Sequence, residues 1–206
     1  MNKKFIYIGG IIAAIVGAFV FQQVSKLPQP EHALYYQQPR KINAFELTDH
    51  HAQRFNKEQL QGKWSLLFLG YTSCPDVCPT TLQNLGFVYD DLKAIADNSQ
   101  VLLLTADPKR DHLKKLSQYI TYFNTEFIAL RAEHDVLFPF ARNLGLMYAI
   151  NGEGEDYLVD HSASLVLINP DGNISAIFKP EQAVGKVPSI DSEKLLSDYQ
   201  KIVALY

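Results

Sequence analysis

The chain has 206 residues, a net charge of −3, and contents of 47% hydrophobic and 20% charged residues. This composition is typical of one globular domain with a sizeable core, and the length is too short for two ordinary domains. The charge argues against a nucleic-acid partner, because nucleic acids are bound by basic surfaces. Two cysteines are too few for a disulfide-rich scaffold, so their close spacing indicates a site.

The N-terminus predicts a membrane anchor. Lys3 and Lys4 precede an apolar run from Phe5 to Phe21. This run is at the lower end of the roughly 17–25 residues that cross a bilayer and exceeds the roughly 7–15 residues of a signal-peptide core. We expect residues 1–22 to be an uncleaved, single-pass anchor in a bacterial inner membrane, with a cytoplasmic N-terminus and a periplasmic functional domain. The alternative is a cleaved signal peptide, which would also export the domain.

A tether and a single domain are expected after the anchor. Residues 23–41 are polar and interrupted by prolines, without sustained periodicity, as in a linker. Residues 42–206 are expected to form the domain. It begins with a short hairpin whose turn contains His50 and His51, both expected to be solvated.

Strands and helices are then expected to alternate. The nearly continuous apolar run at residues 64–69 indicates a central strand covered on both faces. Residues 82–95 repeat apolar positions every three or four residues, as on one face of a helix, and Asp111 is expected to cap a later helix. Further strands are expected at 101–105, 127–130, 146–150, 157–159, 164–168 and 174–178, and further helices at 113–120, 135–143 and 192–205. This order predicts an α/β, thioredoxin-like fold, with a central mixed sheet flanked by helices.

The two cysteines, Cys74 and Cys78, lie between the strand at 64–69 and the helix that follows it. The N-terminal end of a helix favours thiolates. Thiolates are soft ligands that suit copper or zinc, and a pair of thiols can also exchange electrons as a dithiol and a disulfide. Both alternatives are open at this point, and a metal would need a third ligand from elsewhere in the chain.

His161 is the strongest candidate for that third ligand. It lies between two expected strands, in a loop that approaches the cysteine turn in a thioredoxin-like sheet; the alternative is a structural histidine. The other histidines and methionines are expected elsewhere. His32 is expected in the tether, His50 and His51 in the solvated turn, and His112 and His134 on helix surfaces. Met1 is expected at the cytoplasmic terminus and Met147 in the core.

Three segments resemble motifs of the Sco/SenC family of copper-binding cytochrome c oxidase assembly proteins. The sequence GYTSCPDVCPTTL at residues 70–82 resembles the cysteine motif of that family. Residues 107–111, DPKRD, resemble its Asp-Pro-x-Arg-Asp segment, and residues 160–162, DHS, resemble its Asp-His-Ser/Thr segment. One departure is Ser73, where many members have histidine or phenylalanine, and we do not expect it to affect ligation.

The resemblance implies a membrane-anchored copper metallochaperone that helps to assemble the copper centre of cytochrome c oxidase, and not an enzyme in the strict sense. It implies that Cys74, Cys78 and His161 hold one copper ion, as Cu(I), Cu(II) or both. Its implied partners are the copper-bearing oxidase subunit and other copper chaperones. Asp76, Asp107 and Asp160 are then candidates for supporting the site or facing a partner.

The alternative function is a thiol-disulfide oxidoreductase in which Cys74 and Cys78 are the redox-active pair. Redox enzymes of this fold usually separate their cysteines by two residues and carry a cis-proline beside them. Here three residues intervene, and the segment around His161 contains no proline. A thiol peroxidase fits less well, because Thr72 is only two residues before Cys74.

Overall fold

The computed structural model describes residues 15–17, 28–152, 154, 157–181, 185 and 187–206. The expected anchor, residues 1–22, falls almost entirely outside these ranges. Within them, we find no helix with both the length and the apolar character needed to cross a bilayer.

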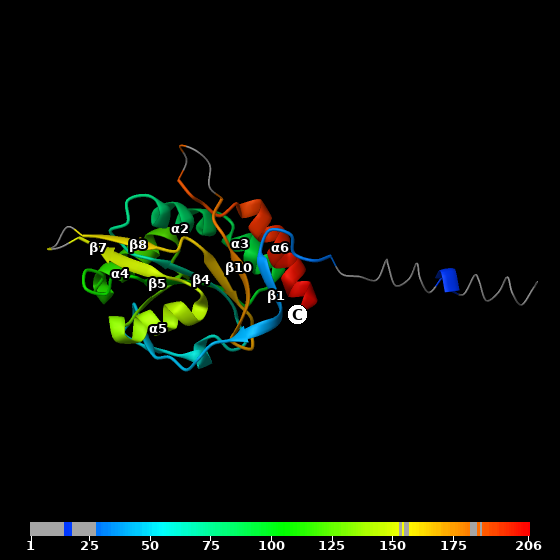
Figure 1. The fold of residues 1–206 in the computed structure, drawn as a ribbon, viewed down its shortest axis with the longest axis horizontal. Coiled ribbons are helices and arrows are strands. Elements are labelled where there is room, and N and C mark those ends of the chain that lie inside the picture. Colours follow the sequence, from blue (N-terminus) through cyan, green and yellow to red (C-terminus); the bar gives the residue numbers. More distant parts are fainter. Residues whose placement is uncertain (1–14, 18–27, 153, 155–156, 182–184, 186) are drawn as a thin grey trace, which may run out of the picture.

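A mixed sheet forms the centre of the domain (Figure 1). Its strand order in the described residues is β1-β10-β9-β4-β5-β6-β2-β3. The middle strand, β4, is parallel to β5 and antiparallel to β9, and all of its residues are buried. The strands are β1 (Leu34–Lys41), β2 (Leu47–Asp49), β3 (Arg54–Phe55), β4 (Trp64–Gly70), β5 (Ser99–Thr105), β6 (Ile128–Arg131), β9 (Leu165–Ile168) and β10 (Asn173–Phe178).

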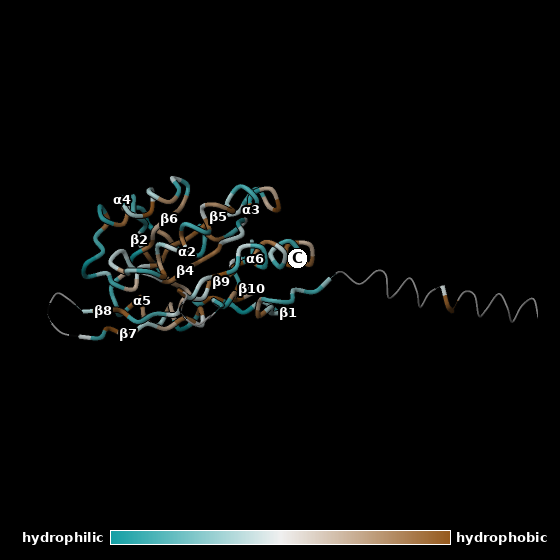
Figure 2. The backbone as a smooth tube through the Cα atoms, turned by 90° about the horizontal axis from the view of Figure 1, so that it is seen from above, coloured by the Kyte–Doolittle hydropathy of each residue, from teal (hydrophilic) through white to brown (hydrophobic). Residues whose placement is uncertain are grey.

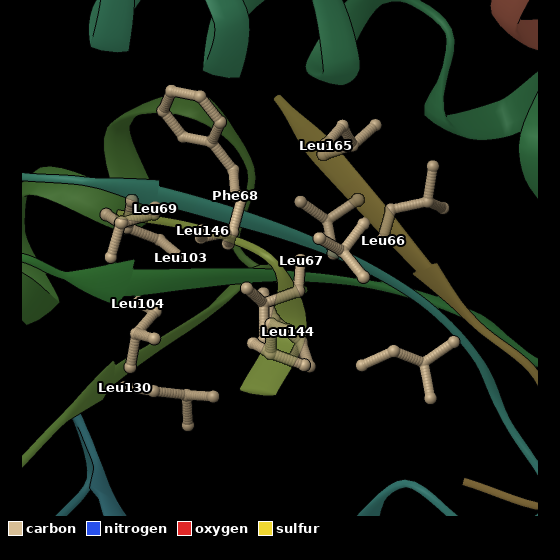
Figure 3. Packing of buried hydrophobic residues seen from close by; sticks show 14 of the residues in the cluster. Leu66, Leu67, Phe68, Leu69, Leu103, Leu104, Leu130, Leu144, Leu146 and Leu165 are labelled. Atoms are coloured by element: carbon tan, nitrogen blue, oxygen red, sulfur yellow. The ribbon is translucent and has the colours of Figure 1, made fainter. Parts of the chain in front are cut away.

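The core gathers around β4 because this strand is covered on both faces, as its continuous apolar sequence predicts. Phe68 of β4 pairs with Leu103 of β5 and with Leu165 of β9. Figure 3 shows these leucines close to Phe68, with Leu144 and Leu146 from the next layer. Figure 2 shows the same division along the backbone, with hydrophobic stretches inside and hydrophilic loops outside.

Helices cover both faces of the sheet. Figure 1 shows α2, α3 and α6 on one side and α5 on the other. The expected helix at 82–95 is divided at Val88 into α2 and α3, and Gly145 ends α5 in the left-handed conformation that glycine adopts readily. The described helices are α2 (Val77–Phe87), α3 (Tyr89–Ile95), α4 (Leu113–Phe123), α5 (His134–Leu144) and α6 (Ser192–Leu205), with one 3₁₀ turn, Lys57–Gln59. The predicted thioredoxin-like arrangement of sheet and helices is confirmed at this level.

A separate hairpin lies at the end of the domain opposite α6. It consists of β7 (Tyr148–Asn151) and β8 (Leu158–His161), which pair only with each other among the described strands. Figure 1 shows it at the far left, away from β1 and α6. The hairpin ends at His161, and three residues separate it from β9.

Four local predictions were wrong. Residues 34–41, predicted to lie in the tether, form the edge strand β1, which pairs with β10. The polar sequence does not indicate a strand, because an edge strand can be held by backbone hydrogen bonds to its neighbour without an apolar pattern. His50 is buried, not solvated, and its Nδ1 accepts the backbone N–H of Ala129 at 3.1 Å. Met147 is 64% exposed and not in the core. Asp111 does not cap α4, because the ring of His112 accepts the backbone N–H of Lys115 instead.

The start of the described domain is fastened to its last helix. The buried carboxylate of Asp198 on α6 accepts backbone N–H groups of Glu31, His32 and Ala33 at distances between 2.6 and 3.0 Å. Since buried carboxylates need such partners, the chain enters the domain at a fixed place beside α6. The cysteine turn and the hairpin lie elsewhere in the domain (Figure 1).

Candidate metal centre

The cysteine turn connects β4 to α2. Cys74 lies in the turn and is half-buried, whereas Cys78 lies in the first turn of α2 and is fully buried. The close packing of Cys78 on β4 requires glycine at residue 70, since a Cβ there would lie 2.9 Å from the Cys78 sulfur. The backbone N–H of Cys78 points toward the Cys74 sulfur at 3.5 Å, as expected for an anionic group at a helix N-terminus.

The structure brings together the three residues that the sequence singled out. The His161 Nε2 lies 3.3 Å from the Cys78 sulfur and 3.9 Å from the Cys74 sulfur. All three donor atoms lie within 4.8 Å of one another. An ion bound by sulfur at about 2.3 Å and by nitrogen at about 2.0 Å needs donors spaced at roughly 3.5–4 Å. The described residues therefore fit a single soft metal ion without a large rearrangement.

The imidazole of His161 is oriented for ligation. Its Nδ1 lies 3.2 Å from the backbone carbonyl oxygen of Ser162, which can only accept a hydrogen bond. With its proton on Nδ1, the ring can present the Nε2 lone pair to an ion held between the two sulfurs, the arrangement that metal-binding histidines use; without an ion, a proton on Nε2 can instead be donated to the Cys74 thiolate. Phe68 and Tyr71 contact the ring edge-on, with centroid distances of 5.9 and 5.8 Å, and fix its plane.

The two thiols have different acidities. The hydrogen bond from the Cys78 thiol lowers the pKa of Cys74 to about 4; His161 and the backbone N–H of Cys78 act in the same direction, and partial burial opposes them. Burial raises the pKa of Cys78, and the adjacent Cys74 raises it further. One sulfur is therefore a half-exposed thiolate and the other a buried thiol, so metal binding must displace the Cys78 proton.

The buried side chain of Asp111 anchors the cysteine turn. Its fully buried carboxylate accepts the backbone N–H of Thr72 at 2.9 Å and the hydroxyl of Thr105 at 2.7 Å, and it also accepts the Thr72 hydroxyl. Lys115 lies 3.5 Å from this carboxylate and donates to the Ser73 hydroxyl at 3.1 Å. Sequence reasoning missed this role, because a helix cap was a sufficient explanation for an aspartate before α4.

Tyr157 fastens the hairpin to the same loop. Its buried hydroxyl donates to Asp107 at 2.5 Å, and the Arg110 guanidinium lies 3.8 Å above its ring. Arg110 also donates to Asp107 and lies 5.8 Å from the ring of Tyr71, which contacts His161. Asp107 is therefore a supporting residue, as the sequence suggested, but Tyr157 was missed because nothing local distinguishes a tyrosine near a turn.

The other candidates lie apart from the three donors. Asp76 and Asp160 are exposed at the rim of the site, and Asp160 accepts a hydrogen bond from Asn151. His134 is half-buried, and its Nδ1 lies 2.8 Å from the Tyr148 hydroxyl. The remaining described histidines, none of which belongs to a metal-binding cluster in the described residues, are His32, His50, His51 and His112.

The fold and the site together define a thioredoxin-like protein with a Cys-x₃-Cys turn and a distant histidine. A sequence profile of the SCO1/SenC family matches residues 35–191. The chain therefore belongs to the SCO1/SenC family, as its three motifs predicted.

Individual relatives agree with this assignment. A protein of Stutzerimonas stutzeri named for copper binding is 40% identical over 137 residues, covering 66% of this chain and 67% of the relative. The SCO2-like protein of Rickettsia felis is 32% identical over 181 residues, covering 84% of this chain and 88% of the relative.

Solved structures agree as well. ScoI of Arabidopsis thaliana, determined with copper bound, has a TM-score of 0.72 and 27% identity, covering 81% of this chain and all of its own. Yeast Sco1 with copper bound has a TM-score of 0.70 and 26% identity, covering 82% of this chain and 91% of its own.

Proposed function

We propose that this protein is a copper metallochaperone that carries one copper ion on Cys74, Cys78 and His161. The observation that carries the proposal is the convergence of two sulfurs and one imidazole nitrogen, within 4.8 Å, at a half-open position. Thiolate and imidazole are donors that copper accepts readily. The copper-bound neighbours and the relative named for copper binding support copper over zinc.

The different acidities of the two cysteines suit capture and release. The half-exposed Cys74 thiolate meets the incoming ion first. Cys78 then loses its proton and His161 contributes Nε2, so the ion becomes three-coordinate. With no fourth protein ligand among the described residues, an acceptor can add a ligand and remove the ion by stepwise exchange.

The setting and the partners belong to the same proposal. An anchor at residues 1–22 would place the domain on the periplasmic side of a bacterial inner membrane. The recipient is the copper-bearing subunit of cytochrome c oxidase, and other copper chaperones supply the ion. This part rests on the N-terminal sequence and on the family to which the chain belongs.

The test is a competition titration of the full-length, detergent-solubilised, reduced protein with Cu(I) and Cu(II). We expect one tight equivalent. His161→Ala should weaken Cu(I) binding by roughly 100-fold, since one ligand contributes about 3 kcal/mol of the roughly 10–16 kcal/mol in a four-ligand zinc site. The matched control is His51→Ala, an exposed histidine outside the site. Unchanged affinity in His161→Ala would remove His161 from the site.

A second function, thiol-disulfide reduction, is favoured by one observation. The pKa of Cys74 is lowered to about 4 beside a second thiol, as in reactive thiols. In this reaction the Cys74 thiolate attacks a partner disulfide and forms a mixed disulfide. Cys78 then loses its proton and attacks Cys74, so that the Cys74–Cys78 disulfide forms and the partner leaves as a dithiol, having received two electrons from the cysteine pair, one proton from Cys78 and one from solvent. Rapid reduction of a model disulfide by the metal-free protein, retained in His161→Ala, would favour this function over copper delivery.

A further inference from the structure

Exposed apolar side chains lie on and beside the β7–β8 hairpin. Ala149 and Leu158 belong to the hairpin, and Met147 directly precedes it. Met147 is 64% and Leu158 59% exposed. Together with Phe138 of α5, 45% exposed, these three residues form what we call the hairpin face.

Two hollows flank the strand that ends at His161. One, of about 410 Å³, lies on the hairpin face and is lined by Phe138, Met147 and Ala149 together with His161. The other, of about 260 Å³, lies over Cys74 and is walled by Leu158 and His161. His161 and Asp160 line both hollows. The two hollows are therefore adjacent, and the surface of one partner protein can cover both.

The charged residues around the two hollows indicate which kind of partner can dock there. The charged residues that line them are Asp76 and Asp160, both exposed and both acidic. A second copy of this chain would bring like charges together, and an anionic lipid surface would be repelled as well. The hairpin face also lies at the opposite end of the domain from β1 and α6, where the chain enters from its N-terminal segment (Figure 1). It is therefore directed away from the tether.

We propose that the hairpin face docks the protein that exchanges copper with this site, and that this partner presents an apolar surface ringed by basic residues. This inference rests on the proposed copper-carrier function. Exposed apolar side chains gathered beside a functional site are typical of protein-protein contacts. Docking here puts the edge of the interface at Cys74 and His161, where an incoming ligand can displace them.

The experiment compares two acceptors of Cu(I) from the full-length, loaded protein. One is the metal-free copper domain of the oxidase subunit from the same bacterium, and the other is a small Cu(I) chelator that needs no docking. In the variant with both Met147→Lys and Ala149→Lys, two exposed positions that line only the first hollow, we expect transfer to the oxidase domain to slow at least tenfold. Transfer to the chelator and the Cu(I) affinity should stay within twofold of the unmodified protein.

Two controls sharpen the result. Tyr122→Lys adds the same charge at an 85% exposed aromatic residue on α4 and should leave both transfer rates within twofold. Met147→Leu keeps the apolar surface and removes the thioether, so it too should leave transfer unchanged. A loss of transfer in Met147→Leu would make Met147 a metal ligand instead of a docking residue and overturn the inference.

The remaining outcomes separate the inference from the function beneath it. Equal rates to the oxidase domain in the double lysine variant and in the unmodified protein would overturn docking at the hairpin face while leaving the copper carrier intact. If the unmodified protein gave no copper to the oxidase domain but did give it to the chelator, the proposed recipient would be wrong and the inference would fall with it.

Discussion

The two halves of the proposed metal site are held in different ways. The cysteine turn continues directly from the fully buried strand β4 and is tied to the core by the carboxylate of Asp111. His161 arrives on a hairpin that pairs with no other described strand and is fastened to the core side by Tyr157. One half is thus built into the sheet, and the other is docked against it. The difference suggests that protein stability and metal affinity depend on different residues.

The largest expected effect is a loss of stability when the cysteine turn, the half of the site that is built into the sheet, loses its support. Asp111→Ala leaves the N–H of Thr72 and the hydroxyl of Thr105 without their buried acceptor. Hydrogen bonds to a charged group contribute about 1.5–3 kcal/mol each, so the free energy of unfolding should fall by about 3 kcal/mol, measured by urea denaturation. Asp76→Ala, an exposed aspartate that makes no side-chain cap, should change it by less than about 0.5 kcal/mol. Similar losses in both variants would contradict the central role of Asp111.

The second prediction concerns protons within the same half. Because the pKa of Cys74 is lowered to about 4 and that of Cys78 is raised, only Cys78 holds a proton at neutral pH. Copper binding should release one thiol proton. The apparent Cu(I) affinity should therefore fall about tenfold, or about 1.4 kcal/mol, when the pH is lowered from about 8 to about 7. Proton release during titration measures this directly. Two ordinary thiols would release two protons and give a hundredfold change.

The docked half should behave differently. Tyr157→Phe removes only the hydroxyl that donates to Asp107, a loss of about 1 kcal/mol. We expect this loss to appear as a roughly fivefold weaker Cu(I) affinity, since the hairpin must be docked for His161 to face the sulfurs. The free energy of unfolding should change far less than in Asp111→Ala. Tyr122→Phe, at an exposed ring, is the control. A variant that lost stability but not affinity would show that the hairpin is not an independently docked unit.

The sequence was informative where the chemistry is local. The apolar strand, the cysteine turn and the strand that ends at His161 follow from periodicity and spacing. The three family motifs added the expectation that Cys74, Cys78 and His161 form one copper site. The supports were hidden, because Asp111 reaches Thr72 across 39 residues and Tyr157 reaches Asp107 across 50. No local pattern records such pairings. Met147 was misplaced for a related reason: an apolar run predicts burial, whereas here it continues into a hairpin whose residues are mostly exposed.

The smallest expected effect tests the one departure from the family motif, Ser73. This residue is exposed, and its side chain accepts a hydrogen bond from Lys115 at 3.1 Å. Exposed contacts of this kind contribute at most about 0.5 kcal/mol, and the backbone of the turn is already held through Thr72. Ser73→Ala should therefore change Cu(I) affinity by less than about twofold, in the same competition titration. A larger loss would mean that the position before Cys74 helps to orient the thiolate, and that the built-in half depends on its exposed rim as well as on Asp111.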